Sequence, residues 1–308
     1  MAQLTVSDVL ASVKAGDSLR NAELSGIDLS NTCLDKANFA AAYLRRTRLR
    51  NISGLGVDLS GATLILAELS GSCLANSKLN QAKLTQAQLA SVNLERAQAI
   101  DAQLYGARLD RAQASYACFQ RANLQAASGP QARFKYANLA EAQLDGANFS
   151  QSSFEGAQLS RSSWQQATLS GISFASADLP QADLTAAILT GANLCEANAL
   201  NANFQEADLT AAMLHAAQLD WANLWNAVLM QADLQRASLY GATLEFANLS
   251  GANLRNADLR EANLENAQLD GVCLEGCRVT GALFTDTTGL SPEQRQWLRR
   301  QGALNVAR

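Results

Sequence analysis

Leucine or phenylalanine recurs at every fifth position over most of the chain. The progression from Leu19 to Phe284 visits 54 positions, of which 47 are Leu or Phe, and Ala stands two residues earlier at 40 of them. The repeating unit is therefore Ala-x-Leu-x-x, and one register is kept over residues 17–286 without a net insertion. A period of five fits neither the period of about 3.6 of a helix nor the period of about 2 of a strand, so the pattern predicts a repeat architecture.

Each pentad predicts a short extended segment followed by a corner. Ala and Leu are spaced by two, which places both side chains on one side of an extended backbone. The next two residues are polar or Gly, and 14 of the 19 Gly residues occupy the last position of the unit. Gly at that position permits the positive φ that a tight corner needs. Repeated corners wind the chain into an all-β solenoid with Ala and Leu inside.

Four consecutive units carry a family resemblance: Ala-Asn-Leu-Ser-Gly, Ala-Asn-Leu-Arg-Asn, Ala-Asp-Leu-Arg-Glu and Ala-Asn-Leu-Glu-Asn, over residues 247–266. They resemble the A(D/N)LXX repeats of the pentapeptide-repeat family, in particular bacterial members of the cyanobacterial type. The resemblance covers residues 17–286. It implies a right-handed quadrilateral β-helix with four pentads per coil and hence about 13 coils.

One internal feature favours twenty residues per coil. Three small residues break the Leu pattern, and Phe stands twenty residues after each of them: Ala99, Ala114 and Gly129 precede Phe119, Phe134 and Phe149. A small residue stacked against a large one conserves core volume. Coincidence is the other interpretation, since a spacing of five fits two of the three.

Both ends of the chain predict short capping helices. Residues 7–15 suit a helix with Ser7 as N-cap and Gly16 as its stop, and Ser291-Pro-Glu-Gln begins a second helix with a capping box. A solenoid must cover its open edges. We therefore expect three segments: an N-terminal capping helix (1–16), the repeat β-helix (17–286), and a C-terminal capping helix and tail (287–308).

The second helix leaves two interpretations open. Trp297 and Leu298 cover the last coil in the first, which makes the helix a lid on a monomer, and Gly302 ends it. In the second, the same two side chains form a dimer contact, as C-terminal elements do in some members of the family that this chain resembles.

Two stretches predict local irregularity. In residues 125–131, Gly129 replaces the inward Leu and Pro130 lacks a backbone N–H, so we expect a bulge or kink. In residues 51–56, Leu55 is expected to turn inward because Gly54 occupies the inward position.

The composition bears on the cellular compartment in which the protein is expected. No apolar run reaches the length of a membrane span, and the first residues lack the basic and apolar regions of a signal peptide. Six Cys occur without paired spacing; Cys33 and Cys73, the closest pair in register, are expected two coils apart. Free thiols favour a cytoplasmic protein.

No set of residues suggests catalysis, a metal site or a cofactor. The single His, His215, occupies an outward position, which is usual for a surface residue. The glycines follow the corners rather than forming a phosphate-binding loop, and no base is placed to activate a Ser or Thr. We expect a protein that is not an enzyme and has no cofactor.

Charge is unevenly distributed along the sequence. Residues 1–140 hold 15 basic and 10 acidic residues, whereas residues 141–308 hold 9 basic and 18 acidic ones. A basic patch near the N-terminus consists of Arg45, Arg46, Arg48 and Arg50. It is either a solvated surface or a site for an anionic partner. Direct binding of nucleic acid is not expected, given the overall acidity.

Large apolar side chains occupy outward positions in the second half. The candidate partner-binding residues are Trp221, Trp225, Tyr240, Phe246, Met213 and Met230. With twenty residues per coil, Trp225 is expected beside Phe246, and Tyr240 beside Gly241, the residue that follows Trp221 by one coil. Outward aromatics close to one another are typical of a binding surface, although single surface aromatics are also common.

Two functions follow. The first is a non-enzymatic scaffold that presents a rigid surface to an unidentified protein partner. The alternative is a DNA mimic that modulates a type II topoisomerase, as quinolone-resistance members of the family do. Residues 162–235 hold seven acidic residues and no Lys or Arg; the proposed acidic face consists of Asp178, Asp183, Asp208 and Asp233. A mimic would need one continuous acidic face.

Overall fold

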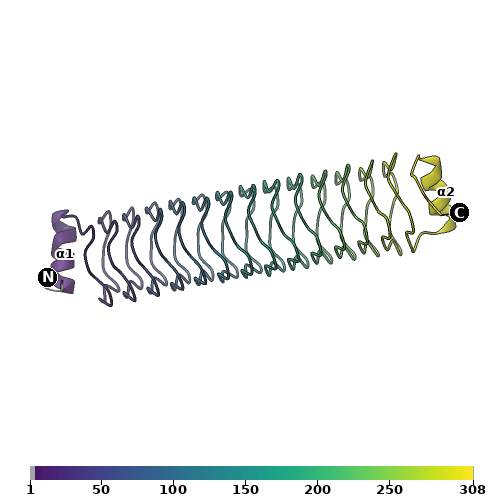
Figure 1. The fold of residues 1–308 in the computed structure, drawn as a ribbon. Helices are drawn as coiled ribbons and strands as arrows, with labels where there is room; N and C mark the ends of the chain where they lie inside the picture. Colours follow the sequence, from purple (N-terminus) through teal and green to yellow (C-terminus); the bar gives the residue numbers. More distant parts are fainter. Residues whose placement is uncertain (1–3, 308) are drawn as a thin grey trace. The chain divides into compact units, whose positions relative to one another are not determined.

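The computed structural model describes residues 4–307. The chain forms two compact units, unit 1 (Met1–Gln158) and unit 2 (Leu159–Arg308). Within each unit, successive coils lie side by side, with helix α1 at the start of unit 1 and helix α2 at the end of unit 2 (Figure 1). The division into residues 1–16, 17–286 and 287–308 remains our proposal for how the chain is organised.

Each coil contains twenty residues and has four sides. The second residue of the Ala-x-Leu-x-x unit pairs in parallel with the residue twenty positions later, as in Glu23 with Tyr43 and Asp183 with Asn203. Each extended segment is so short that only this central residue pairs. Four pentads therefore complete one turn, which confirms the predicted solenoid and its four-sided coil.

The hydrogen bonds of one pentad explain why the register is so strict. Leu209 donates its N–H to the Val228 carbonyl at 2.7 Å, and Asp208 donates to the Ala187 carbonyl of the preceding coil at 3.0 Å. The fourth residue differs, because its N–H goes to a side chain: Thr210 donates to Asp208 Oδ1 at 2.9 Å. Asn and Asp are frequent at the second position because they cap this otherwise unused N–H.

The expected bulge at residues 125–131 is wrong. Pro130 occupies the fourth position of its pentad, where no ladder hydrogen bond is donated, and its carbonyl still accepts from Arg111 N–H at 3.0 Å. Ser128 pairs on both sides, with Arg108 and Asn148, so the ladder continues without interruption. Proline is therefore tolerated here for a positional reason.

The expected inward turn of Leu55 is also wrong, because this side chain is 42% exposed. The volume left by Gly54 is filled instead by Leu74 from the next coil, which would clash with a Cβ at 2.9 Å. The same compensation occurs at Gly129, where any Cβ would overlap the Phe149 ring. The predicted stacking of a small residue against a Phe twenty positions later is confirmed for Gly129 and Phe149.

The core consists of the inward Ala and Leu positions, which are buried throughout the described residues except at the start of the solenoid, where Ala22 is half-buried. In unit 1 the inward aromatic rings pack on one another, with Phe134 and Phe154 stacked at 4.8 Å. In unit 2, Trp164 takes the place of Leu and donates its indole N–H to Ser162 Oγ at 2.8 Å. A buried indole needs such an acceptor.

The corners adopt the left-handed conformation whether or not they contain Gly. Gly241 has φ of 64° and Gly191 of 64°, while Leu66 has 60° and Trp221 has 59° at the same position of their pentads. A non-glycine residue in this region is strained by about 1–2 kcal/mol. The ladder hydrogen bonds on either side of each corner hold it there.

The N-cap of helix α1 (Val6–Ala15) lies two residues earlier than the sequence predicted. Thr5, not Ser7, is the N-cap; it accepts from Asp8 N–H, and the Asp8 carboxylate accepts from Thr5 N–H in a capping box. The predicted stop is confirmed, because Gly16 has φ of 78°. Val9 is fully buried.

Helix α2 (Pro292–Arg300) has the predicted N-cap, Ser291, and the predicted capping box with Gln294. Its last residue is Arg300, and the predicted stop is confirmed, because Gly302 adopts the left-handed conformation and allows Ala303 N–H to reach the Leu298 carbonyl at 3.1 Å. Leu298 is fully buried.

The chain beyond α2 closes the edge of unit 2 in a way that the sequence did not predict. Phe284 N–H donates to the Leu304 carbonyl at 3.0 Å, and Leu304 N–H donates to the Ala282 carbonyl at 2.8 Å. Leu304 thus pairs in parallel with Leu283. The last coil is covered by both a helix and an added ladder.

Candidate protein-interaction surface

One side of unit 2 carries a row of outward amide and hydroxyl groups. Asn203, Asn223, Thr243 and Asn263 occupy successive coils and pair with one another along the backbone. Asn223 Nδ2 donates to Asn203 Oδ1 at 3.0 Å, which orients both side chains. The row is uncharged and its amides can donate and accept hydrogen bonds.

A first aromatic pair stands at one corner of this side. The rings of Trp221 and Tyr240 meet edge to face, with centroids 5.3 Å apart and an interplanar angle of 88°. Trp221 is 54% exposed and lies against Gly241 of the next coil, as expected from the spacing. The Arg260 guanidinium lies 5.5 Å from the centre of the Tyr240 ring, which adds a cation–π contact.

A second pair stands at the other corner of the same side. Trp225 and Phe246 have centroids 6.1 Å apart at 73°, and Phe246 is 45% exposed. Because the pentad segment 222–224 runs between Trp221 and Trp225, the two pairs border the amide row. We call Trp221, Asn223, Trp225, Tyr240 and Phe246, with their neighbours in the row, the aromatic-edged face.

The two methionines of the predicted set lie elsewhere. Met213 pairs with Asn193 and Asp233, on a different side of the coil, and is 45% exposed. Met230 occupies the corner one pentad beyond that of Trp225. The structure therefore brings together the four aromatic residues and leaves both methionines outside their face.

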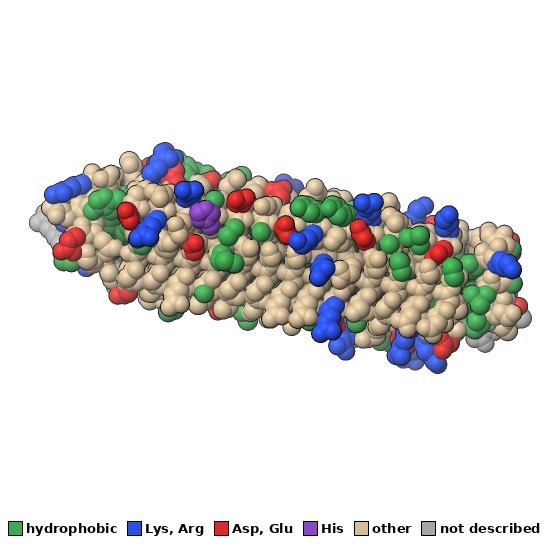
Figure 2. Space-filling view, turned by 180° about the vertical axis from the view of Figure 1, so that it is seen from behind, with side chains coloured by type: hydrophobic (Ala, Val, Ile, Leu, Met, Phe, Trp, Pro, Cys, Tyr) green, Lys and Arg blue, Asp and Glu red, His purple; other side chains and the backbone are tan. Residues whose placement is uncertain are grey.

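The four proposed acidic residues lie on four different sides of unit 2. Asp178 pairs with Asn198, Asp183 with Asn203, Asp208 with Val228 and Asp233 with Asn253. In this order, each residue lies on the side of the coil that follows the side of the residue before it. They do not form a continuous acidic face. On the surface seen in Figure 2, too, acidic side chains are scattered among basic and uncharged groups.

Two of these carboxylates accept hydrogen bonds from backbone N–H groups of their own pentads. Burial acts to raise the pKa of Asp183, but hydrogen bonds from Thr185, Gln165 and Asn203 outweigh it and hold that pKa below its ordinary value. Burial opposes the charge of Asp208 in the same way, and hydrogen bonds from Thr210 and Thr190 lower its pKa. Their charge is thus engaged within the fold.

The basic patch of unit 1 is partly neutralised. Arg48 forms an ion pair with Asp28 at 3.0 Å, and Arg50 forms one with Glu68 at 2.9 Å. Within residues 4–307, Arg45 and Arg46 have no acidic partner within ion-pair distance. The patch wraps from one corner across a side to the next corner rather than forming a flat area.

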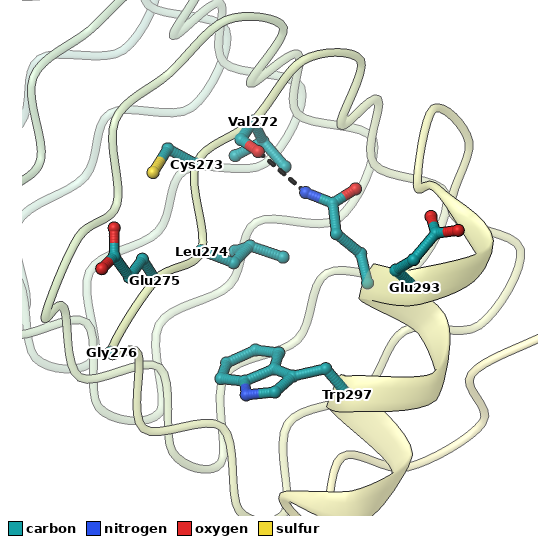
Figure 3. Close-up of a pocket in the computed structure, with 8 residues that line it drawn as sticks. Val272, Cys273, Leu274, Glu275, Gly276, Glu293 and Trp297 are labelled. Carbon is teal, nitrogen blue, oxygen red and sulfur yellow. Dashed lines mark hydrogen bonds between the residues drawn. The ribbon is translucent and has the colours of Figure 1, made fainter.

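A groove lies between α2 and the coil beneath it (Figure 3). Its volume is about 500 Å³, and Leu274, Cys273 and Trp297 line it. Gln294 Nε2 donates to the Val272 carbonyl at 2.9 Å and anchors the helix to that coil. The expected covering role belongs to Leu298, whereas Trp297 is half-buried beside the groove.

The cysteines are free thiols, consistent with their lack of paired spacing. Cys277 alone is buried; burial raises its pKa to about 12, and its Sγ–H donates to the Leu254 carbonyl at 2.8 Å. It behaves as a small core residue.

Sequence reasoning missed one aromatic column in unit 1. Tyr116 and Tyr136 stack with centroids 5.3 Å apart at 18°, and Arg96 lies 5.9 Å from the centre of the Tyr116 ring. Gly156 completes the column, because a Cβ there would lie 2.5 Å from the Tyr136 ring. The spacing in the sequence could have revealed this column, because each of these four residues stands twenty positions after the previous one.

Four-sided coils and repeated Ala-x-Leu units define the class of protein, a β-solenoid built from five-residue repeats. A family model for pentapeptide repeats matches eight segments, residues 18–52, 56–86, 87–125, 119–151, 152–191, 187–226, 212–245 and 247–286. The chain therefore belongs to the pentapeptide-repeat family. No curated protein matches it.

Several solved structures are similar to this chain. HetL, a pentapeptide repeat protein involved in heterocyst differentiation regulation from the cyanobacterium Nostoc sp. strain PCC 7120, is 29% identical over 86% of this chain and 96% of its own, with a TM-score of 0.22. Rfr23 from the cyanobacterium Cyanothece 51142 is 30% identical over 39% of this chain and 90% of its own, with a TM-score of 0.24.

QnrB1, a plasmid-mediated fluoroquinolone resistance protein, is 20% identical over 65% of this chain and 96% of its own, with a TM-score of 0.36. At such TM-scores these likenesses lend no weight to a shared function. In the part of the chain that the structure describes, no helix is long and apolar enough to cross a membrane.

Proposed function

We propose that this protein is a non-enzymatic interaction scaffold and that the aromatic-edged face of unit 2 binds a protein partner. The proposal includes a right-handed sense of the coil, as is known for the family. The observation that carries it is the pairing of Trp221 with Tyr240 and of Trp225 with Phe246 on the two corners of the side that carries the amide row.

The energetics of association support this assignment. Exposed Trp and Tyr are the side chains that most often dominate binding energy at interfaces. Here each ring is held by an edge-to-face neighbour, so little side-chain entropy is lost on binding. The amide row between the pairs offers donors and acceptors to a partner backbone.

The test is affinity purification from the native cell, with the double variant Trp221→Ala and Trp225→Ala as bait. We expect it to lose a protein that the wild type retains. Met213→Ala is the matched control, because Met213 is a large apolar side chain of similar exposure on another side of the coil. Equal retention by all three baits would refute the proposed face.

Modulation of a type II topoisomerase by DNA mimicry is the less favoured alternative. Its support is the run of seven acidic and no basic residues between 162 and 235. The separation of Asp178, Asp183, Asp208 and Asp233 onto four sides weakens it, because a mimic must present its charges along one surface.

A further inference from the structure

Three polar recesses follow one another along a single corner of unit 1. The first is lined by Arg50, Ser70 and Gly71, and it shares Ala90 and Ser91 with the second. The second shares Arg111 and Gln131 with the third. Small residues occupy the corner in two successive coils, as Ser70 with Gly71 and Ala90 with Ser91. The shared lining residues join the three recesses into one groove, which we call the corner groove.

Arginine side chains line this groove at its wider end. The third recess has a volume of about 450 Å³ and is lined by Arg111, Gln113, Gln131, Arg133, Gln151 and Ser153. It contains two guanidinium groups, four neutral polar side chains and no carboxylate. An anionic group is the ligand that such a lining solvates best.

A ladder of side chains holds Arg111 in place. Arg111 Nε donates to Gln131 Oε1 at 3.1 Å, and Gln131 Nε2 donates to Gln151 Oε1 at 3.2 Å. This leaves both terminal nitrogens of the Arg111 guanidinium to face a ligand. Within residues 4–307, neither Arg111 nor Arg133 has an acidic side chain within ion-pair distance.

The other arginines of the groove are already paired. Arg50 contacts Glu68 at 2.9 Å, and Arg108 contacts Asp110 at 3.4 Å. The free charge is therefore concentrated at Arg111 and Arg133, which lie one coil apart on the corner and on the side that follows it.

Two properties of this region decide which class of ligand it suits: the small number of unpaired arginines and the lack of free aromatic ring faces nearby. A nucleic acid needs many phosphate contacts or exposed ring faces for its bases. The nearest aromatic column offers no free ring face, because Arg96, Tyr116, Tyr136 and Gly156 cover one another in turn. An acidic peptide needs only a few guanidinium groups for its carboxylates, and Gln and Asn side chains suit its backbone.

We propose that the corner groove of unit 1 binds an extended, Glu- and Asp-rich peptide segment of a protein. Arg111 and Arg133 bind its carboxylates, and Gln113, Gln131 and Gln151 bind its backbone. This site is separate from the aromatic-edged face and does not depend on it.

The test is fluorescence anisotropy of a labelled Glu-rich peptide titrated with the full-length protein. The double variant Arg111→Gln and Arg133→Gln should weaken binding at least about tenfold, since each lost charged hydrogen bond is substantial. The matched control is Arg45→Gln with Arg46→Gln, which removes the same charge from another part of unit 1. Thermal melts of both variants show whether the fold is kept.

Selective loss in the Arg111 and Arg133 variant, with binding retained by the control, supports the groove. Equal loss in both variants means general electrostatic attraction and overturns it, as does the absence of peptide binding. A single-stranded oligonucleotide of the same charge serves as competitor. If it binds more tightly and depends on the same two arginines, the assignment to an acidic peptide is wrong.

Discussion

The indole of Trp221 lies against Gly241, the residue that stands one coil further along unit 2. A Cβ at position 241 would overlap the ring, so the missing side chain of Gly241 leaves the space that Trp221 occupies in the first aromatic pair. Tyr240, the neighbour of this glycine, supplies the edge-to-face partner.

Gly241→Ala should therefore displace Trp221 and separate it from Tyr240. Gly191→Ala is the control, because Gly191 has the same φ of 64° but nothing within 4 Å of a new Cβ. Both variants are strained by about 1 kcal/mol. Only Gly241→Ala should change the near-UV circular dichroism and the tryptophan fluorescence; equal spectra for the two variants would show that Gly241 does not seat the ring.

The core predicts a sharp contrast between neighbouring residues. Leu209 is buried, and Leu209→Ala should lower the free energy of unfolding by about 2–5 kcal/mol, because it leaves a cavity. Asp208 accepts hydrogen bonds from Thr210 and Thr190, so Asp208→Ala should cost about 1 kcal/mol. Urea unfolding measures both, and a larger effect at Asp208 would contradict the inward assignment of Leu209.

Acid should weaken unit 2 through Asp258. Hydrogen bonds from Arg260, with the charges of Arg260 and Arg278, lower the pKa of this carboxyl from its ordinary value of 3.8, although burial opposes them. A lowered pKa stabilises the fold fully above the unfolded pKa, and that stability is lost as pH falls through the folded pKa.

Asp258→Asn should therefore flatten the dependence of the unfolding free energy on pH below about pH 4. The measurement is urea unfolding of wild type and variant across that range. If both proteins lose stability with the same slope, the Asp258 carboxylate does not contribute as described.

Removal of the C-terminal lid should expose the last coil. A chain ending at Thr288 lacks both α2 and Leu304, the residue whose pairing with Leu283 completes the edge. The open edge then offers unpaired backbone groups, and association should rise with protein concentration. Sedimentation of the truncated chain measures this; a protein that stays monomeric at high concentration would show that residues 289–307 are not a lid.

Much of the fold could be predicted from the sequence because every coil repeats the same constraint. An inward Leu such as Leu209 and an outward neighbour such as Asp208 follow from the spacing alone. The bulge at Pro130 was predicted wrongly because a pattern of residues does not reveal which N–H groups the ladder leaves unused. The N-cap of α1 was misplaced because Thr5 and Ser7 are both good caps.

The candidate site could be predicted in part. The spacing of twenty placed Trp225 beside Phe246, and the structure has that pair. The same arithmetic separates Met213 from the aromatic residues and joins Tyr116 to Tyr136, but only once the coil length is fixed. The corner groove could not be predicted, because it depends on small residues in successive coils and on the Gln ladder beside Arg111.

The most direct test of the central claim is a titration of the purified partner against two variants at several salt concentrations. The first is Trp225→Ala; the second replaces Asp178, Asp183, Asp208 and Asp233 with Asn. We expect Trp225→Ala to weaken binding at least about tenfold and added salt to have little effect, because desolvated aromatic rings dominate. If Trp225→Ala binds normally while the Asn variant loses its partner and salt weakens binding steeply, the acidic residues carry the function and the aromatic-edged face does not.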